Sequence, residues 1–196
     1  MALQTIVKPY PAMAILEFGS IADGIYSTDA VLKKAPIAMI KSGTVSGGRY
    51  LIILGGSPAS VQESMSVATG ILDSVFLPDV HDRLHDAILG KRAECRQDSV
   101  AILETDTISS NVRASERALK GTGVELVEIR IAEYEMSGKA ISVFNGELHE
   151  IEAAMQLAGG HHRIIARPHG TLTQHLGDAT RFAETKPRAL EGEEVS

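Results

Sequence analysis

Short apolar runs and segments with helical periodicity alternate along the first half of the chain. The apolar run at residues 13–18 predicts a strand. The residues that recur at helical spacing after it would share one face of a helix: Ile21, Ile25, Thr28 and Leu32. Runs at residues 37–40 and 50–54 predict two further strands, and the glycine-rich segment 41–49 between them predicts a turn.

The first half then closes with a helix, a strand and a short helix. One helical face would be formed by Val61, Met65, Ala68 and Leu72. Residues 74–78 predict the strand, and residues 81–89 predict the last helix. This half therefore reads β-α-β-β-α-β-α, with a hairpin in the middle.

The same pattern returns in the second half. The sequence Ala-Ile-Leu-Glu of residues 14–17 recurs at 101–104, 87 positions later. The offset then becomes 90, so Gly48 matches Gly138 and Pro78 is expected to match Pro168. A repeat of about 90 residues has the length of a small domain, not of a solenoid unit. The chain is therefore predicted to contain two copies of one domain.

The second copy supplies the corresponding elements. Its first helix would present Ile108, Val112, Ser115 and Leu119 on one face, and its second helix Ile151, Met155 and Ala158. Strands are expected at 124–131, 140–144 and 163–168, with a turn at 133–139 and a final helix at 171–176. Each copy is thus predicted to be an α+β domain whose helices cover one face of a sheet.

The domain boundaries follow from these elements. Residues 1–12 form an N-terminal extension, residues 13–90 the first domain and residues 100–182 the second. The polar segment 91–99 is the expected linker. The tail at 183–196 lacks apolar periodicity and is expected to be disordered.

Composition limits the functions that such a chain performs. Hydrophobic residues make up 44% of the 196 residues and aromatic residues only 4%, so the cores must be aliphatic. The net charge of −6 argues against a general nucleic-acid-binding protein. The single cysteine, the lack of an 18-residue apolar run and the lack of a secretory signal favour a cytoplasmic protein that does not enter a membrane.

Candidate catalytic and metal-binding residues are few. His81 and His85 have the i, i+4 spacing that suits two metal ligands, but a solvated helix face explains them better. Cys95 lies in the linker and is more simply a free thiol than a nucleophile. Glu17 recurs as Glu104, which suggests either paired carboxylates or, more simply, a contact shared by both copies. We therefore expect no enzyme activity, no cofactor and no metal.

Several of these segments together resemble a known family. They are the repeated Ala-Ile-Leu-Glu strand, the first helix ending in Leu-Lys, the hairpin Gly-Gly-Arg-Tyr-Leu-Ile-Ile-Leu-Gly-Gly and the Arg-Pro-His at 167–169. The chain resembles the bacterial microcompartment shell proteins, of the tandem-domain, trimer-forming type and nearest to the single-layer propanediol-utilisation kind. The resemblance implies two ferredoxin-like domains in the non-permuted order.

This resemblance also implies a function. Three chains would form a pseudohexameric tile that packs with other shell proteins around enzymes, and small metabolites would cross the shell through its central pore. The pore-lining positions that it implies are Thr44, Val45, Ser46, Gly47, Gly48, Glu135, Met136, Ser137 and Gly138. The implied tile-edge residues are Lys33, Lys120 and Arg167, of which the arginine has no counterpart in the first copy.

Two further expectations concern residues of the implied pore. Some relatives hold an iron–sulfur cluster on a pore cysteine, but Ser46 occupies that position, so no cluster is expected. Glu133 and Glu135 would form rings of carboxylates that favour cations if both face the axis.

Two other classes of function stay open at this point. A trimeric ferredoxin-like protein that binds a small ligand or signals would also be built from such domains. An enzyme is the weaker alternative, because the sequence shows no convergent set of acid, base and nucleophile.

Overall fold

The computed structural model describes residues 10–95, 99–133, 136–178 and 180–181. Residues 1–9 and the predicted disordered tail at 183–196 lie outside the described residues. The first half contains β1 (Ala12–Phe18), α1 (Ile21–Lys34), β2 (Met39–Val45), the 3₁₀ turn η1 (Ser46–Gly48), β3 (Arg49–Gly56), α2 (Pro58–Met65), β4 (Ile71–Leu77) and α3 (Asp82–Ile88). The second half contains β5 (Ser99–Thr105), α4 (Ile108–Gly121), β6 (Glu125–Arg130), β7 (Ala140–Gly146), α5 (Leu148–Ala158), β8 (His161–Ala166) and α6 (Gly170–Asp178).

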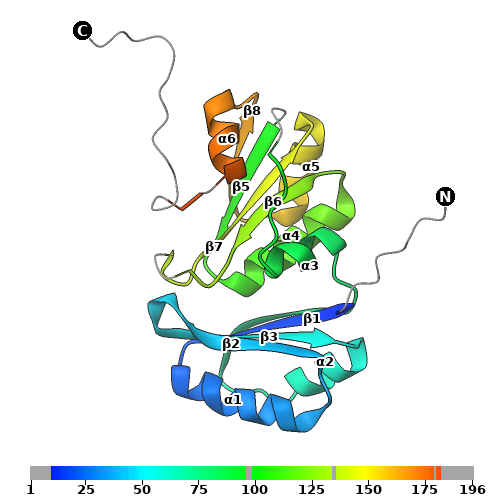
Figure 1. The fold of residues 1–196 in the computed structure, drawn as a ribbon, viewed down its shortest axis with the longest axis vertical. Helices are drawn as coiled ribbons and strands as arrows, with labels where there is room; N and C mark the ends of the chain where they lie inside the picture. Colours follow the sequence, from blue (N-terminus) through cyan, green and yellow to red (C-terminus); the bar gives the residue numbers. More distant parts are fainter. Residues whose placement is uncertain (1–9, 96–98, 134–135, 179, 182–196) are drawn as a thin grey trace, which may run out of the picture.

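Each half forms a four-stranded antiparallel sheet, and the two halves lie one above the other (Figure 1). The strand orders are β2-β3-β1-β4 and β6-β7-β5-β8, so the two sheets have the same topology. The predicted order β-α-β-β-α-β-α is confirmed in both halves. The first strand of each half is central, which explains why the most apolar repeated segment occupies that position.

Two local predictions for the first half were wrong, one at the hairpin turn and one at the end of the second helix. Strand β2 continues to Val45, so the glycine-rich turn shrinks to the three residues of η1. Helix α2 ends at Met65, and Leu72 lies in β4 with half of its side chain exposed. Leu72 has the spacing of the helical face by coincidence, because the chain has already entered the next strand.

The offset between the copies also differs from the predicted one in the last strand. Glu17 pairs with Asp73 in the first sheet, and its counterpart Glu104 pairs with His161 in the second, which gives β4 and β8 an offset of 88. A register irregularity next to Glu17 in the pairing of β1 with β4 absorbs part of the difference. Pro78 and Pro168 are therefore not equivalent, although the sequence predicted that they would be.

The helix caps after these strands confirm the offset of 88. The ring Nδ1 of His81 accepts the Arg83 N–H at 3.2 Å, at the start of α3. The ring Nδ1 of His169 accepts the Thr171 N–H at 3.2 Å, at the start of α6. The two histidines thus fill the same position in the two copies.

Both faces of the first sheet are covered. Alternate residues of β1, such as Leu16, pack with α1 and α2. The other set, including Met13 and Ile15, packs with α3 and with the second domain. Helix α3 therefore lies on the face opposite α1 and α2, so the prediction that all helices cover one face was wrong. The predicted amphipathic pattern identifies which residues of a helix are apolar, but not which sheet face they meet.

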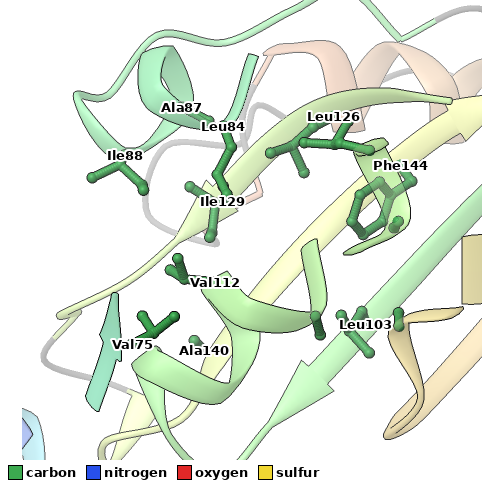
Figure 2. Close-up of a cluster of buried hydrophobic side chains, with 14 of the residues drawn as sticks. Val75, Leu84, Ala87, Ile88, Leu103, Val112, Leu126, Ile129, Ala140 and Phe144 are labelled. Carbon is green, nitrogen blue, oxygen red and sulfur yellow. The ribbon is translucent and has the colours of Figure 1, made fainter. Parts of the chain in front are cut away.

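Helix α4 lies between the two sheets and joins the domains (Figure 1). Figure 2 shows Val75 of β4 beside Val112 of α4, with Leu84 of α3 and Leu126 of β6 in the same cluster. Val112 and Leu84 have no exposed surface. The main core is therefore continuous across the domain interface, by which we mean the contact of α4 and the 136–139 loop with the first domain.

Candidate functional site

The two loops for which the family resemblance implied a pore-lining role lie side by side. The Ser46 hydroxyl in the first loop accepts the Gly138 N–H from the second at 2.8 Å, and both residues are buried. Arg49 donates from Nη1 to the Gly138 carbonyl oxygen at 3.1 Å. Gly47 has a φ of 73°, a left-handed conformation that glycine adopts without strain. Two loops from different domains thus form one hydrogen-bonded unit.

The other residues of these loops have different exposure. Thr44, Gly47, Gly48 and Ser137 are exposed, whereas Val45 and Met136 are half-buried. Glu135 lies outside the described residues. Ser46 is 4% exposed and its hydroxyl is already engaged, so among the described residues of these loops the exposed surface belongs to Thr44, Gly47, Gly48 and Ser137.

Glu133 contradicts the expected carboxylate ring. Its carboxylate accepts hydrogen bonds from Arg130 and, at 2.6 and 3.0 Å, from Arg181. Burial acts to raise the pKa of this carboxyl, but the two guanidinium groups outweigh burial and hold the pKa below its usual value. Glu133 is therefore a buried, ionised carboxylate whose charge is balanced by two arginines, and it does not contribute a free negative charge.

The repeated glutamate serves the contact between domains. Glu17 has no exposed surface, and its Oε1 accepts the Ser109 N–H at the start of α4 at 2.5 Å. Arg49 Nη1 lies 3.7 Å from the other carboxylate oxygen. Burial raises the pKa of Glu17. Its counterpart Glu104 is half-buried and pairs instead with Lys139 at 2.5 Å, so the same position faces a filled interface in one copy and an open surface in the other.

A second polar cluster fixes α4 against β4. Asp73 accepts hydrogen bonds from the Thr107 hydroxyl at 2.6 Å and from Arg113 Nη2 at 3.1 Å. Arg113 also donates to the Ser74 carbonyl oxygen at 2.5 Å. Burial acts to raise the pKa of Asp73, but the donors from Thr107 and Arg113 outweigh it and lower the pKa.

A third contact lies at the far end of α4. The Glu116 carboxylate accepts the His81 N–H at 3.0 Å, and Lys120 Nζ donates to the Asp79 carbonyl oxygen at 2.5 Å. Lys120 also pairs with Glu116 at 2.8 Å. Of the three residues that the sequence assigned to a tile edge, Lys120 thus lies at the domain interface. All three residues are exposed, and, within the described part of the chain, Lys120 alone also contacts the other domain.

The remaining candidate catalytic and metal-binding residues take part in packing or helix capping. His85 is buried beside Tyr10, with Nδ1 3.3 Å from Asp86, and His81 caps α3. Cys95 is half-buried, and burial raises the pKa of its thiol. Within the described residues, no three His, Cys, Asp or Glu side chains gather as metal ligands would. The described helices also include none that is long and apolar enough to span a membrane.

Sequence reasoning missed most of these interface residues. Asp73, Thr107 and Arg113 are polar residues without a motif, and only the sheet register and the packing of α4 bring them together. Arg49 did leave a signal, because a basic residue follows the Ser-Gly of both loops, at Arg49 and at Lys139.

Comparison with known proteins agrees with this architecture. The model of the BMC domain family matches residues 12–80 and again residues 99–167. The bacterial microcompartment shell protein PduT of Citrobacter freundii is 30% identical over 179 residues, which cover 84% of this chain and 97% of that protein. A microcompartment protein from Desulfitobacterium hafniense has a crystal structure with a TM-score of 0.72 and 29% identity, over 83% of this chain and 98% of that one. The chain therefore belongs to the BMC domain family, as two tandem copies, and is a shell protein of the bacterial microcompartment.

Proposed function

We propose that three copies of this chain form a ring of six domains that serves as a shell tile, with a metabolite pore where the 44–48 and 135–138 loops meet. In this ring the domain interface seen within one chain alternates with an equivalent interface between chains. At that protomer interface, α1 of one copy packs on the second sheet of the next, as α4 packs on the first sheet.

The exposure of α1 carries this proposal. Ile21, Ile25 and Leu32 are 37%, 57% and 51% exposed. Their counterparts in α4 are Ile108, Val112 and Leu119, which are 0%, 0% and 4% exposed because the first domain covers them. This apolar stripe is buried in the second domain and exposed in the first domain. The difference indicates an interface that a single chain leaves open.

The surface that would receive α1 shows the same difference. Ile102, Ile141 and Ile165 of the second sheet are half-buried. The residues at the matching positions of the first sheet are Ile15, Leu51 and Leu77, and none is more than 7% exposed. Because the stripe and its receiving face differ, their contact is heterologous, and a heterologous contact forms a ring when the rotation between subunits closes.

A polar contact of the domain interface also has a counterpart for the ring. Glu17 accepts the Ser109 N–H near the start of α4. Glu104 stands at the matching position of the second sheet, and Ala22 N–H stands near the start of α1. The contact uses a main-chain donor, so the change from Ser109 to Ala22 leaves it possible. A carboxylate at a helix N-terminus is also favoured by the helix dipole.

The pore follows from the same alternation. Ser46–Gly48 and Met136–Gly138 lie together within a chain, and the protomer interface would bring together the same loops of adjacent copies. Six loops around one axis would surround a small opening lined by the exposed residues Thr44, Gly47, Gly48 and Ser137. We propose that small metabolites cross there, and that Lys33 and Arg167, on the exposed rim, contact neighbouring tiles of the same shell.

The ring is tested by one substitution on α1. Ile25→Asp places a charge in the proposed interface, and we expect sedimentation velocity to show monomers where the unchanged protein shows trimers. Leu148→Asp is the matched control, because Leu148 is 42% exposed on α5, outside the stripe. Trimers that persist in Ile25→Asp, or an unchanged protein that is monomeric at all concentrations, would refute the proposal.

A further inference from the structure

An exposed ion pair on α1 has a counterpart inside the domain interface. Lys33 Nζ lies 2.5 Å from Asp29 Oδ2, with the two side chains 74% and 66% exposed. The matching pair on α4 is Lys120 and Glu116, with side chains 46% and 9% exposed. The two pairs occupy the same helical positions, so the difference in exposure comes from what each pair meets.

The α4 pair binds the main chain where α3 begins. Glu116 accepts the His81 N–H with both carboxylate oxygens, at 3.0 and 3.2 Å. Lys120 donates to the carbonyl oxygen of Asp79, two residues earlier. The carboxylate therefore meets the N-terminal end of a helix and the ammonium group meets a carbonyl oxygen, the arrangement that helix termini favour.

The second domain contains the same structure at the start of α6. His169 matches His81, since each ring Nδ1 accepts the N–H two residues later. Arg167 accordingly matches Asp79. Within the described residues the His169 N–H meets no acceptor, and His169 is exposed. The second domain thus presents the donor and the carbonyl oxygen that the first domain already has paired.

We propose that Asp29 and Lys33 clamp the start of α6 in a second copy of this chain, with Asp29 accepting the His169 N–H and Lys33 donating to the Arg167 carbonyl oxygen. This inference rests on the proposed ring and assigns its polar anchor. It gives Lys33 a role within the tile, in addition to the edge role that the family resemblance implied. Both contacts are made to main-chain atoms, so they remain possible although the side chains differ between the two domains.

The experiment compares four proteins by sedimentation equilibrium and by hydrogen exchange of the amides at residues 169–173. We expect Asp29→Ala to weaken trimer formation at least about tenfold and to speed exchange at His169, because a charge-assisted hydrogen bond is lost at each protomer interface. Asp29→Glu should restore both properties, since glutamate holds the matching position in α4. Lys34→Ala is the control, because Lys34 pairs with Glu63 in its own domain.

The possible outcomes separate the two proposals. A trimer whose stability and His169 exchange are unchanged by Asp29→Ala would overturn the clamp and leave the ring intact. An unchanged protein that never forms trimers would overturn the ring and the clamp together. Weakening by Asp29→Ala that Asp29→Glu does not restore would also count against the clamp.

Discussion

Gly24 lies directly against the ring of Tyr50, so that a Cβ atom on Gly24 would be 2.4 Å from Tyr50 Cδ1. The second copy holds Asn111 and Ala140 at these positions, and there the Asn111 side chain donates to the Ala140 carbonyl oxygen at 3.2 Å. The first domain thus has a large side chain on the strand and glycine on the helix. The second domain has a small residue on the strand and a larger side chain on the helix. The two copies fill the same space between helix and sheet in different ways.

Gly24→Ala is therefore expected to destabilise the first domain. The added methyl group has no room, and displacing the Tyr50 ring should lower the free energy of unfolding by about 1–3 kcal/mol, despite the better helix propensity of alanine. Urea denaturation followed by circular dichroism measures this change. Gly43→Ala is the control, because a Cβ there meets nothing within 4 Å, and an equal loss in both variants would contradict the steric explanation.

The Ser46 hydroxyl should stabilise the contact between the two loops through its hydrogen bond with the Gly138 N–H. Ser46→Ala leaves the buried Gly138 N–H without an acceptor, which is expected to cost about 1–3 kcal/mol. Faster hydrogen exchange at Gly138 would report the loss at the site itself. Ser42→Ala, at an exposed position of the preceding strand β2, should leave that exchange rate unchanged. Unaltered exchange at Gly138 in Ser46→Ala would refute the assigned role.

Glu133 should make stability depend on acid pH. Its pKa is lowered in the folded protein, so the stability that it contributes is present above the unfolded value near 4.5 and is lost as the pH falls through the lower, folded pKa. Glu133→Gln should therefore be less stable than the unchanged protein at neutral pH, by about 1.5–3 kcal/mol. Below the folded pKa the two proteins should converge. A constant difference between pH 7 and pH 3 would contradict this prediction.

Asp73 and Arg113 should show a modest coupling energy. Their side chains are 25% and 43% exposed, so solvent screening limits the ion pair. A double-mutant cycle with alanine at both positions is expected to give about 0.5–1 kcal/mol. The pair of Lys34 and Glu63, which is also partly exposed but lies within one domain, serves for comparison. A coupling near zero for Asp73 and Arg113 would show that packing alone holds α4 against β4.

The sequence predicted the order of the elements because the local patterns were strong and occurred twice. It did not predict that the apolar stripe of α1 with Ile25 points away from its own sheet, since periodicity identifies a face but not its partner. The register of β4 was lost for a similar reason. Matching prolines at Pro78 and Pro168 suggested one offset, but the pairing of Glu17 with Asp73 shows another.

The candidate site was located from the sequence only through the family resemblance. It identified the loops with Ser46 and Ser137, and the structure places them in contact. The charges around them were less predictable, because a carboxylate such as Glu133 is free or neutralised according to residues distant in the sequence. Arg181, which binds it, lies 48 positions away.

The short connection from α3 to β5 places the two halves of the domain interface on one chain. Such a link gives the interface an effective concentration far above the concentration of the protein itself. The domain interface therefore forms independently of protein abundance, whereas a contact between copies obeys mass action. In the proposed ring of six domains, the fusion of two domains in one chain would thus make half of the contacts insensitive to dilution, and only the other half would depend on how much protein the cell makes.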